Sequence, residues 1–310
     1  MLPIPMIWLY QVFLNYPRLK SIKPSPFKRK FFVTRLTPDD IDTLSNQLAD
    51  FDEKLLLQTG EDMLGIACHG AGISKETIQN SIKDLKLAAV TLSSGLGQIT
   101  GFAQTIGDIL THIGFNAFVP GETDAAGFAR AIEKETDIIF MADDNRYIAV
   151  NLKKCRLIDN AGATGNIFAA TLDLMARGLK GQRVLVIGCG PVGIASAETL
   201  ISFGAHVGLH DKDQAKCENY CTTLEKRRSK RVEPIHDLKV ACKDFNFLVE
   251  ATNAKGVINS SMINPATLIV APGIPLGITP NAVKKASNQI LYDPLQLGTV
   301  AMAVMAALPD

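Results

Sequence analysis

The chain has 310 residues, a formal net charge of +1 and 47% hydrophobic residues. This length predicts two domains with well-formed cores, and a net charge near zero argues against a nucleic-acid partner held through its phosphates. Six cysteines are scattered through the sequence without a disulfide framework, and their spacing suits no metal site. We therefore expect a cytoplasmic protein without a metal.

The first 35 residues differ in composition from the rest of the chain. Residues 3–14 are apolar and aromatic, and residues 17–30 are basic and contain prolines. The apolar run is too short to cross a bilayer, and it precedes the lysines, which reverses the order found in signal peptides. A surface-lying anchor is the alternative, but we expect residues 1–35 to be a poorly ordered extension, with no membrane partner.

Residues 36–165 alternate between helical and strand-like patterns. A threonine, a proline and two acids at residues 37–40 are typical of a helix start, and apolar spacing predicts that this helix continues through Leu55. The further elements expected here are helices at 78–87, 99–113 and 125–135 and strands at 88–92, 116–119 and 136–141. This alternation predicts a small parallel sheet and hence a smaller N-terminal α/β domain.

Residues 166–310 repeat the alternation and predict a Rossmann-type domain, so the fold class is α/β. A helix at 161–179 connects the two domains. The strands expected after it lie at 184–187, 206–210, 247–251, 268–271 and 290–292, and the helices at 194–203, 214–227, 281–286 and from Gly298 onwards. Ligands of such folds bind at the carboxyl ends of the parallel strands.

A glycine-rich turn follows the strand at 184–187 and has the spacing of a dinucleotide-binding fingerprint. Gly188 permits the tight turn, Gly190 lets a pyrophosphate approach the backbone, and Gly193 lets the helix pack on the strand. Pro191 and Val192 begin that helix, whose N-terminal N–H groups favour phosphate. The alternative is an α/β turn that binds nothing.

Asp211 ends the next strand, where the fingerprint requires an acid. Its carboxylate can accept hydrogen bonds from the ribose hydroxyls, which favours NAD over NADP. Lys212 follows it, but one lysine beside a retained acid does not make a site for a 2′-phosphate. We therefore expect NAD as the cofactor.

Two adjacent carboxylates, Asp143 and Asp144, follow the apolar run at residues 138–141. One of them is suited to hold a substrate ammonium, accept its proton and stabilise the cation that forms when hydride leaves. The alternative is structural: the aspartate caps the next helix, with Arg146 as its salt-bridge partner. Both interpretations stay open on the residues alone.

Two further polar segments lie near the expected hinge. Ser94 belongs to a glycine-rich turn at residues 93–97, whose N–H groups and hydroxyls suit a carboxylate or phosphate. Asn160 opens the connecting helix, where its amide suits a polar substrate. Helix capping is the alternative for Ser94 and for Asp159 with Asn160. No histidine has an acid partner in sight, which favours an amine over an alcohol substrate.

Several segments occur in an order that resembles the pyrrolysine synthase family, also described as 3-methylornithyl-lysine dehydrogenases. These segments are LTPDDI from residue 36, SGLG from 94, MADDN from 141, DNAGATG from 159, PGIP from 272 and PLQLGTVAM from 294. With the glycine motif they cover about residues 36–308, and their combination is far more specific than the glycine motif. The chain departs from the family pattern at Leu92-Ser93 and at Asp159, where the pattern has asparagine.

The resemblance implies a role for individual residues. Asp143 faces the reacting amine, Ser94 and Asn160 orient the substrate, and Leu36 and Asp39 open a helix that covers the substrate. The residues implied to hold NAD are Gly188, Gly190, Pro191, Val192, Gly193 and Asp211, with Thr252 and Pro272 lining the nicotinamide side.

The activity implied by the resemblance is an NAD-dependent oxidation of a small-molecule isopeptide, lysine carrying 3-methyl-D-ornithine on its ε-nitrogen. Oxidation of the terminal amine and attack by the ornithine α-amine close a pyrroline ring and release ammonia, which gives pyrrolysine. The alternatives are another NAD-linked amine or imine oxidoreductase acting on a shorter, ornithine-like substrate, and a non-enzymatic NAD-binding sensor. The sequence leaves open whether the protein forms a homodimer.

Overall fold

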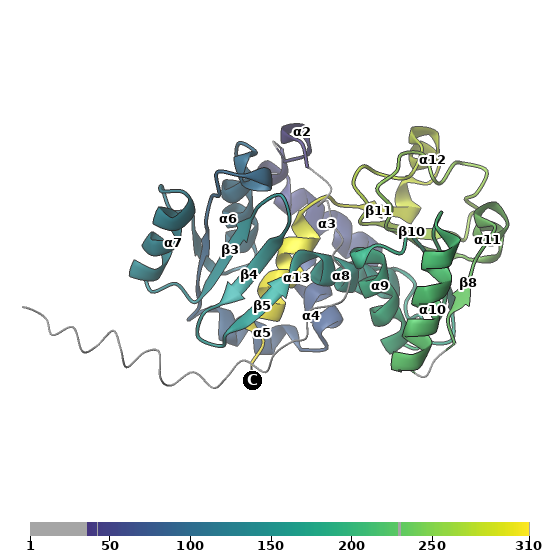
Figure 1. The fold of residues 1–310 in the computed structure, drawn as a ribbon, viewed down its shortest axis with the longest axis horizontal. Helices are drawn as coiled ribbons and strands as arrows, with labels where there is room; N and C mark the ends of the chain where they lie inside the picture. The colour runs from purple at the N-terminus through teal and green to yellow at the C-terminus, as the bar shows by residue number, and fades with distance from the viewer. Residues whose placement is uncertain (1–35, 42, 229–230, 310) are drawn as a thin grey trace, which may run out of the picture. The chain divides into compact units, whose positions relative to one another are not determined.

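Two β-sheets, one in each half of the chain, organise the structure, a computed structural model (Figure 1). It describes residues 36–41, 43–228 and 231–309, without the side chains of residues 39, 40 and 228. The extension expected at residues 1–35 lies outside the described residues. The predicted α/β class with a Rossmann-type C-terminal half is confirmed.

The described N-terminal helices show that the single helix expected over residues 37–55 was wrong. The helices here are α2 (Pro38–Ile41), the 3-10 turn η1 (Leu44–Asn46), α3 (Leu48–Thr59), α4 (Met63–Ala71) and α5 (Lys75–Ile82). Leu44 and Leu48 are both buried, so the apolar spacing was read correctly. However, Ser45 and Asn46 favour local hydrogen bonds over continued helix, which allows the chain to break there.

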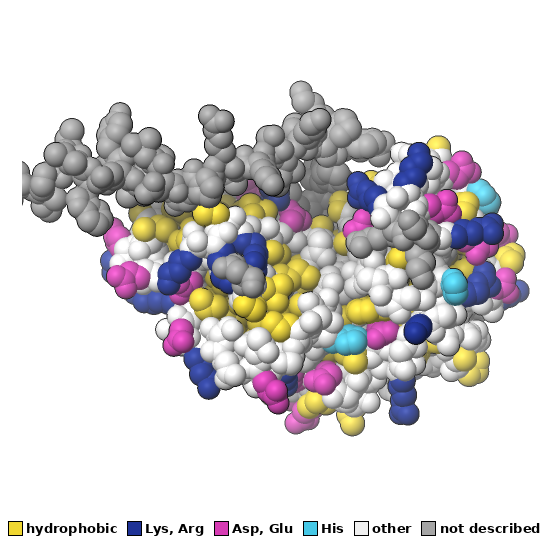
Figure 2. All heavy atoms as spheres, turned by 90° about the horizontal axis from the view of Figure 1, so that it is seen from below, with side chains coloured by type: hydrophobic (Ala, Val, Ile, Leu, Met, Phe, Trp, Pro, Cys, Tyr) yellow, Lys and Arg dark blue, Asp and Glu magenta, His cyan; other side chains and the backbone are white. Residues whose placement is uncertain are grey.

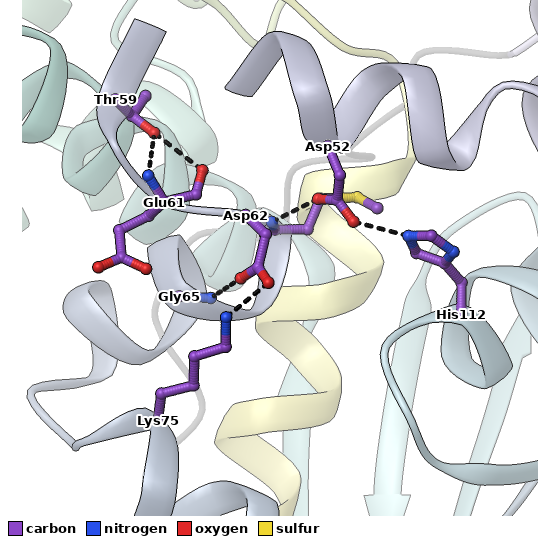
Figure 3. Close-up of polar contacts among 8 residues, drawn as sticks. Asp52, Thr59, Glu61, Asp62, Gly65, Lys75 and His112 are labelled. Atoms are coloured by element: carbon purple, nitrogen blue, oxygen red, sulfur yellow. Dashed lines mark hydrogen bonds and ion pairs between the residues drawn. The ribbon is translucent and has the colours of Figure 1, made fainter. Parts of the chain in front are cut away.

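Buried and half-buried carboxylates join these helices to one another (Figure 3). Asp52 on α3 accepts a hydrogen bond from the Met63 backbone N–H at 2.7 Å and contacts His112 Nε2 at 2.6 Å. Asp62 caps α4 by accepting from the Gly65 N–H at 2.8 Å and pairs with Lys75. Each carboxylate therefore connects the start of α4 to a different neighbouring element.

The N-terminal sheet is mixed, which corrects the parallel sheet expected from the sequence. Its strands are β1 (Lys86–Ala89), β2 (Asn116–Phe118), β3 (Ile138–Ala142), β4 (Tyr147–Asn151) and β5 (Arg156–Asp159), in the order β2-β1-β3-β4-β5. Strands β1, β2 and β3 are parallel, whereas β4 and β5 run antiparallel. The link between β3 and β4 is too short for a helical crossover, so the chain makes a hairpin there.

Helices cover the two faces of this sheet unequally. The helices near it are α6 (Phe102–His112), preceded by the 3-10 turn η2 (Gly95–Gln98), then α7 (Asp124–Glu133) and α8 (Asn160–Met175). On one face lies the large core, whereas under α7 there is only a small cluster around Ala131 and Ile139. Hydrophobic side chains gather at the surface of the N-terminal half (Figure 2), and the exposed ones include Phe128, Ile132 and Leu157.

The C-terminal sheet is parallel throughout and has the dinucleotide-binding strand order. Its strands are β6 (Arg183–Ile187), β7 (His206–His210), β8 (Glu233–Pro234), β9 (Phe247–Glu250), β10 (Leu268–Ala271) and β11 (Ile290–Tyr292), in the order β11-β10-β9-β6-β7-β8. Numbered within this sheet, the order is 3-2-1-4-5-6 read from β8. The helices in this half are α9 (Pro191–Ser202), α10 (Gln214–Arg228), α11 (Leu238–Asp244), α12 (Pro280–Lys285) and the 3-10 turn η3 (Ser287–Gln289).

The last helix, α13 (Gln296–Ala307), leaves the C-terminal sheet and packs against α8, α4, α6 and β4 (Figure 1). It begins two residues before the expected start at Gly298. The Tyr147 hydroxyl on β4 lies 2.9 Å from the Thr299 hydroxyl, and Asn151 donates to the Ala306 carbonyl at 3.0 Å. Almost every residue of α13 is buried, so both halves of the chain contribute to one continuous core.

Candidate active site

The glycine turn after β6 has the geometry that its spacing predicts. Gly188 has φ +100°, and a Cβ on it would lie 2.6 Å from the Ala251 carbonyl oxygen. A Cβ on Gly193 would lie 1.9 Å from the Gly188 oxygen. Only glycine fits either position, so this turn brings α9 directly against the ends of β6 and β9.

Gly190 differs from the other two glycines because it faces open space. A Cβ added there would meet no described atom within 4 Å. Gly190 is also the N-cap of α9, which has Pro191 in its first turn and no side-chain cap. The backbone N–H groups of this turn are therefore directed at an approachable site, and the residues present fit a dinucleotide pyrophosphate.

Asp211, which follows β7, is bound to this turn. Its Oδ2 accepts a hydrogen bond from the Cys189 N–H at 2.8 Å and contacts Lys216 Nζ at 3.2 Å, while Oδ1 accepts from the Asp213 N–H at 3.0 Å. Burial alone would raise the pKa of Asp211, but these amides and the Lys216 ammonium together lower it. The carboxylate is therefore ionised at neutral pH and lies next to the glycine turn.

Thr252 and Pro272 lie just beyond the carboxyl ends of β9 and β10, which are neighbours in the sheet. Thr252 is half-buried and Pro272 is buried. The sequence indicated both residues as the nicotinamide side. It did not single out Glu250, the last residue of β9, which is fully buried directly behind Thr252. The sequence signal that could have identified Glu250 is a charged residue at the end of an apolar strand.

Asp143 lies in the hairpin turn between β3 and β4, not at the start of a helix. Its Oδ1 accepts hydrogen bonds from the Asn145 and Arg146 N–H groups at 2.7 and 2.8 Å. The structural alternative was therefore right that Asp143 holds local backbone but wrong about the element and the partner. Within residues 36–309 no contact engages its second oxygen, Oδ2, so the half-buried carboxylate keeps one acceptor for a ligand.

The Ser94 turn lies directly against the Asp143 turn. Gly95 has φ +56°, and a Cβ on it would lie 2.1 Å from the Asp144 backbone nitrogen. Ser94 precedes η2 and makes no side-chain capping hydrogen bond, so the capping interpretation does not hold for it. A cavity of about 380 Å³ borders the same turn, lined by residues 91–93 and 97–103. The structure therefore brings Ser94 and Asp143 together.

The end of β5 and the start of α8 form the third part of the site. Asp159 caps α8 by accepting from the Ala161 N–H at 3.1 Å, as the structural alternative predicted. It also binds the Arg146 guanidinium at 2.8 Å. Asn160 accepts from the Thr164 hydroxyl at 3.1 Å, and this pair packs so closely on α13 that Gly298 has no room for a side chain.

Helix α8 connects these residues to the dinucleotide turn. A Cβ on Gly165 would lie 2.5 Å from the Val192 carbonyl oxygen, so α8 and α9 meet there without side chains between them. From Asn160 to Gly165 the helix rises about 7.5 Å. Asn160, which follows Asp159, the partner of Arg146, is therefore placed near the N-terminus of α9.

The remaining expectations have mixed outcomes. Leu36 is buried in the core just before α2, but the side chain of Asp39 lies outside the described residues. Cys155 is exposed and the other cysteines are buried; burial raises the pKa of Cys68 and of Cys242 to about 11, which makes these thiols unreactive. The described residues contain neither a group of ligands arranged for a metal ion nor a helix with the length and apolarity to span a membrane.

Comparisons with known proteins connect this geometry to a family. The family model of the pyrrolysine biosynthesis protein PylD, N-terminal domain, matches residues 40–158, and a putative NAD(P)-binding model matches residues 175–266. The pyrrolysine synthase of Methanosarcina barkeri (strain Fusaro) is 31% identical over 271 residues, which cover 86% of this chain and 95% of that protein. The chain belongs to the pyrrolysine synthase family.

A second member of the pyrrolysine synthase family, from Methanosarcina acetivorans, is 29% identical over 269 residues, covering 86% of this chain and 97% of that protein. Among solved structures, quinate dehydrogenase from Corynebacterium glutamicum in complex with NAD matches with a TM-score of 0.51 and 11% identity, over 72% of this chain and 93% of that one. This likeness shows the fold alone. The resemblance that the sequence motifs indicated is confirmed by the two Methanosarcina relatives.

Proposed function

We propose that this protein oxidises the terminal amine of L-lysine-Nε-3-methyl-D-ornithine with NAD⁺ and so forms L-pyrrolysine. The observation that carries the proposal is that Asp143, with one carboxylate oxygen unengaged within residues 36–309, lies against the Ser94 turn in a pyrrolysine synthase family member. The bound nicotinamide accepts the hydride. All other roles belong to residues of this chain.

The reaction balances in two steps. The carbon that bears the terminal amine loses a hydride to NAD⁺ and the ammonium loses a proton, which leaves an iminium group on the ornithine part. The ornithine α-amine then attacks that carbon, and ammonia leaves as the pyrroline ring closes. Asp143 Oδ2 is the proposed partner of the ammonium, because a carboxylate stabilises the cation and takes up its proton.

Other residues hold the substrate and the cofactor. Ser94 and Asn160 are the proposed substrate donors and acceptors, and α8 sets the distance of Asn160 from the glycine turn. The first turn of α9 holds the pyrophosphate, and Asp211 accepts from the ribose hydroxyls, which supports NAD over NADP. Holding the amine next to the nicotinamide converts a bimolecular step into an effectively unimolecular one.

The test is turnover by the full chain. We expect NADH and a pyrroline product when the purified protein is incubated with NAD⁺ and the isopeptide, and neither product with free ornithine. Turnover of ornithine but not of the isopeptide would instead support an oxidoreductase for shorter amines. NAD binding without turnover of any amine would support a sensor.

The variant Asp143→Asn tests the charge of Asp143. Asparagine keeps an oxygen for the Asn145 and Arg146 N–H groups, so the turn stays intact while the anion is lost. We expect kcat to fall about 10²–10⁴-fold, the range of a positioned acid–base group. The exposed neighbour supplies the control, Asp144→Asn, which should stay near the wild-type rate. A near-wild-type rate for Asp143→Asn removes this residue from the mechanism.

A further inference from the structure

Glu250 is a buried carboxyl group whose side chain accepts three hydrogen bonds. It is 0% exposed at the end of β9. One carboxylate oxygen accepts from the Thr252 N–H at 3.0 Å and from the Thr252 hydroxyl at 2.5 Å, and the other accepts from the Gly277 N–H at 3.1 Å. The carboxylate therefore joins the residue after its own strand to a loop twenty-seven positions away.

That loop, residues 272–277, encloses the carboxylate. A Cβ on Gly277 would lie 2.3 Å from Glu250 Cδ, and a Cβ on Gly273 would lie 2.3 Å from the Thr252 carbonyl oxygen. The Gly273 N–H also donates to the Glu250 backbone oxygen at 3.2 Å. The glycines let the loop approach so closely that it has little room to shift while Glu250 stays in place.

The position of this cluster in the sheet gives it a functional meaning. Thr252 and Pro272 lie at the carboxyl ends of two adjacent parallel strands, β9 and β10, where Rossmann folds bind their ligands. The glycine turn that fits the pyrophosphate lies on the adjacent strand β6, since Gly188 touches the Ala251 oxygen. Asp211, which follows β7, marks the adenine side of the site. The Glu250 cluster at the end of β9 is therefore one strand further from that side than the glycine turn after β6.

Burying this carboxylate also has a cost. Taking a charge out of water is unfavourable unless hydrogen bonds compensate, and an apolar pair at the same place is often at least as stable. Burial raises the pKa of Glu250, and the hydrogen bonds from Thr252 and Gly277 offset this only in part. A carboxyl group kept at such a cost beside a ligand-binding edge indicates a role other than stability.

We propose that Glu250 is the positioning residue for the nicotinamide half of the cofactor. Its carboxylate fixes Thr252 and the 272–277 loop in the single arrangement that receives the nicotinamide riboside, and it does not touch the cofactor itself. This inference rests on the cofactor part of the proposed function. It does not depend on the identity of the amine substrate.

The experiment compares two ligands that differ only in the half concerned. NADH contains the nicotinamide riboside, whereas ADP contains only the adenosine and the pyrophosphate. In Glu250→Gln one acceptor oxygen becomes an NH₂ group, so the side chain can no longer accept from both Thr252 and Gly277. By calorimetric titration of the full chain we expect the Kd of NADH to rise about tenfold. The Kd of ADP should stay within about twofold, since its contacts do not involve Glu250.

A matched control variant is Glu233→Gln, because Glu233 lies on β8 of the same sheet in an exposed pair with Arg183. It should change neither Kd. If Glu250→Gln does not fold, Thr252→Val and Thr252→Ser decide: valine removes the hydroxyl donated to Glu250 and should weaken NADH selectively, whereas serine should restore the wild-type Kd.

Two results would overturn the assignment. An equal loss of NADH and ADP affinity would mean that Glu250 supports the whole domain, and unchanged NADH affinity would mean that it positions nothing. Because neither ligand needs the isopeptide, a failed pyrroline assay leaves this measurement valid. Conversely, a wild-type NADH affinity in the variant leaves the proposed reaction standing.

Discussion

Asp143 and Asp211 are carboxylates in similar places, each just beyond the end of a strand, but their surroundings suit different ligands. Protein donors occupy both oxygens of Asp211, including the Lys216 ammonium. Asp143 accepts its hydrogen bonds from the described residues, the Asn145 and Arg146 N–H groups, on a single oxygen. A crowded carboxylate beside a lysine suits a neutral ribose hydroxyl, whereas a carboxylate with an unengaged oxygen suits an ammonium.

The charge of Asp211 should determine the choice between NAD and NADP. In Asp211→Asn the anion that repels a 2′-phosphate is lost, and Lys216 is released from its 3.2 Å contact to pair with that phosphate. We expect the ratio of NADP to NAD affinity to rise about tenfold. Calorimetric titration with both cofactors measures it. Asp213→Asn, one turn further on, is the control, and an unchanged ratio in Asp211→Asn contradicts the role.

At the scale of elements, the start of α9 differs from the starts of α4, α8 and α11. Asp62, Asp159 and Asp237 cap these three helices with their side chains. The first turn of α9 has no side-chain cap, and a Cβ at its N-cap Gly190 would meet open space. The amides of α9 are therefore available to a phosphate.

Asp293 shows the strongest capping and should have the largest effect on stability. It is buried and accepts from the Leu297, Gln296 and Leu295 N–H groups at 2.7, 3.1 and 3.4 Å, at the start of α13. Asp293→Ala leaves these buried donors unpaired, so we expect about 2–4 kcal/mol of lost unfolding free energy in urea titrations. The exposed cap variant Asp237→Ala should cost about 1 kcal/mol. Equal losses would contradict this difference.

At the scale of the whole molecule, two buried carboxyl groups lie at the carboxyl edge of the C-terminal sheet, Glu250 as the last residue of β9 and Asp293 directly after β11. Burial raises the pKa of each, with hydrogen bonds acting in the opposite direction. The same edge carries Thr252 and Pro272. The C-terminal half therefore buries two carboxyl groups along the edge where Rossmann folds bind ligands, as expected when function limits stability.

This cost should appear as a pH dependence of stability. Between pH 4.5, the ordinary pKa of glutamate, and the raised pKa of folded Glu250, the folded chain retains a proton that the unfolded chain has lost. The unfolding free energy contributed by Glu250 therefore falls as pH rises through this window. In urea titrations at several pH values, the wild type should lose stability relative to Glu250→Gln as pH rises from 4.5, and the difference should then level off. A wild type that gains stability relative to Glu250→Gln as pH rises would contradict this sign.

The C-terminal sheet was predictable because its signals are local. Continuous apolar runs such as Val184–Ile187 are buried on both faces, and the glycines and Asp211 stand at fixed positions along the chain. Strands β4 and β5 were missed for two reasons. The charged turn that leads into β4, residues 143–146, looks like a helix cap, and β4 itself alternates between buried and half-exposed residues instead of forming a continuous buried run.

For the candidate site, the sequence indicated the right segments but not their contacts. The pairing of Arg146 with Asp159, and the contact of Gly95 with the Asp143 turn, depend on the mixed sheet and could not be seen from spacing. Glu250 was missed because its partners Thr252 and Gly277 are joined only in three dimensions. Motifs of neighbouring residues can be predicted from the sequence, whereas contacts between residues distant along the chain depend on the topology of the fold.

The path of α13 has a consequence for the order of biosynthesis. This helix is translated after every strand of both sheets, yet it covers the apolar face of a sheet whose strands lie in the first half of the sequence. On the ribosome that face stays bare until α13 leaves the exit tunnel. The N-terminal sheet is therefore completed after the C-terminal sheet, although its strands are made first.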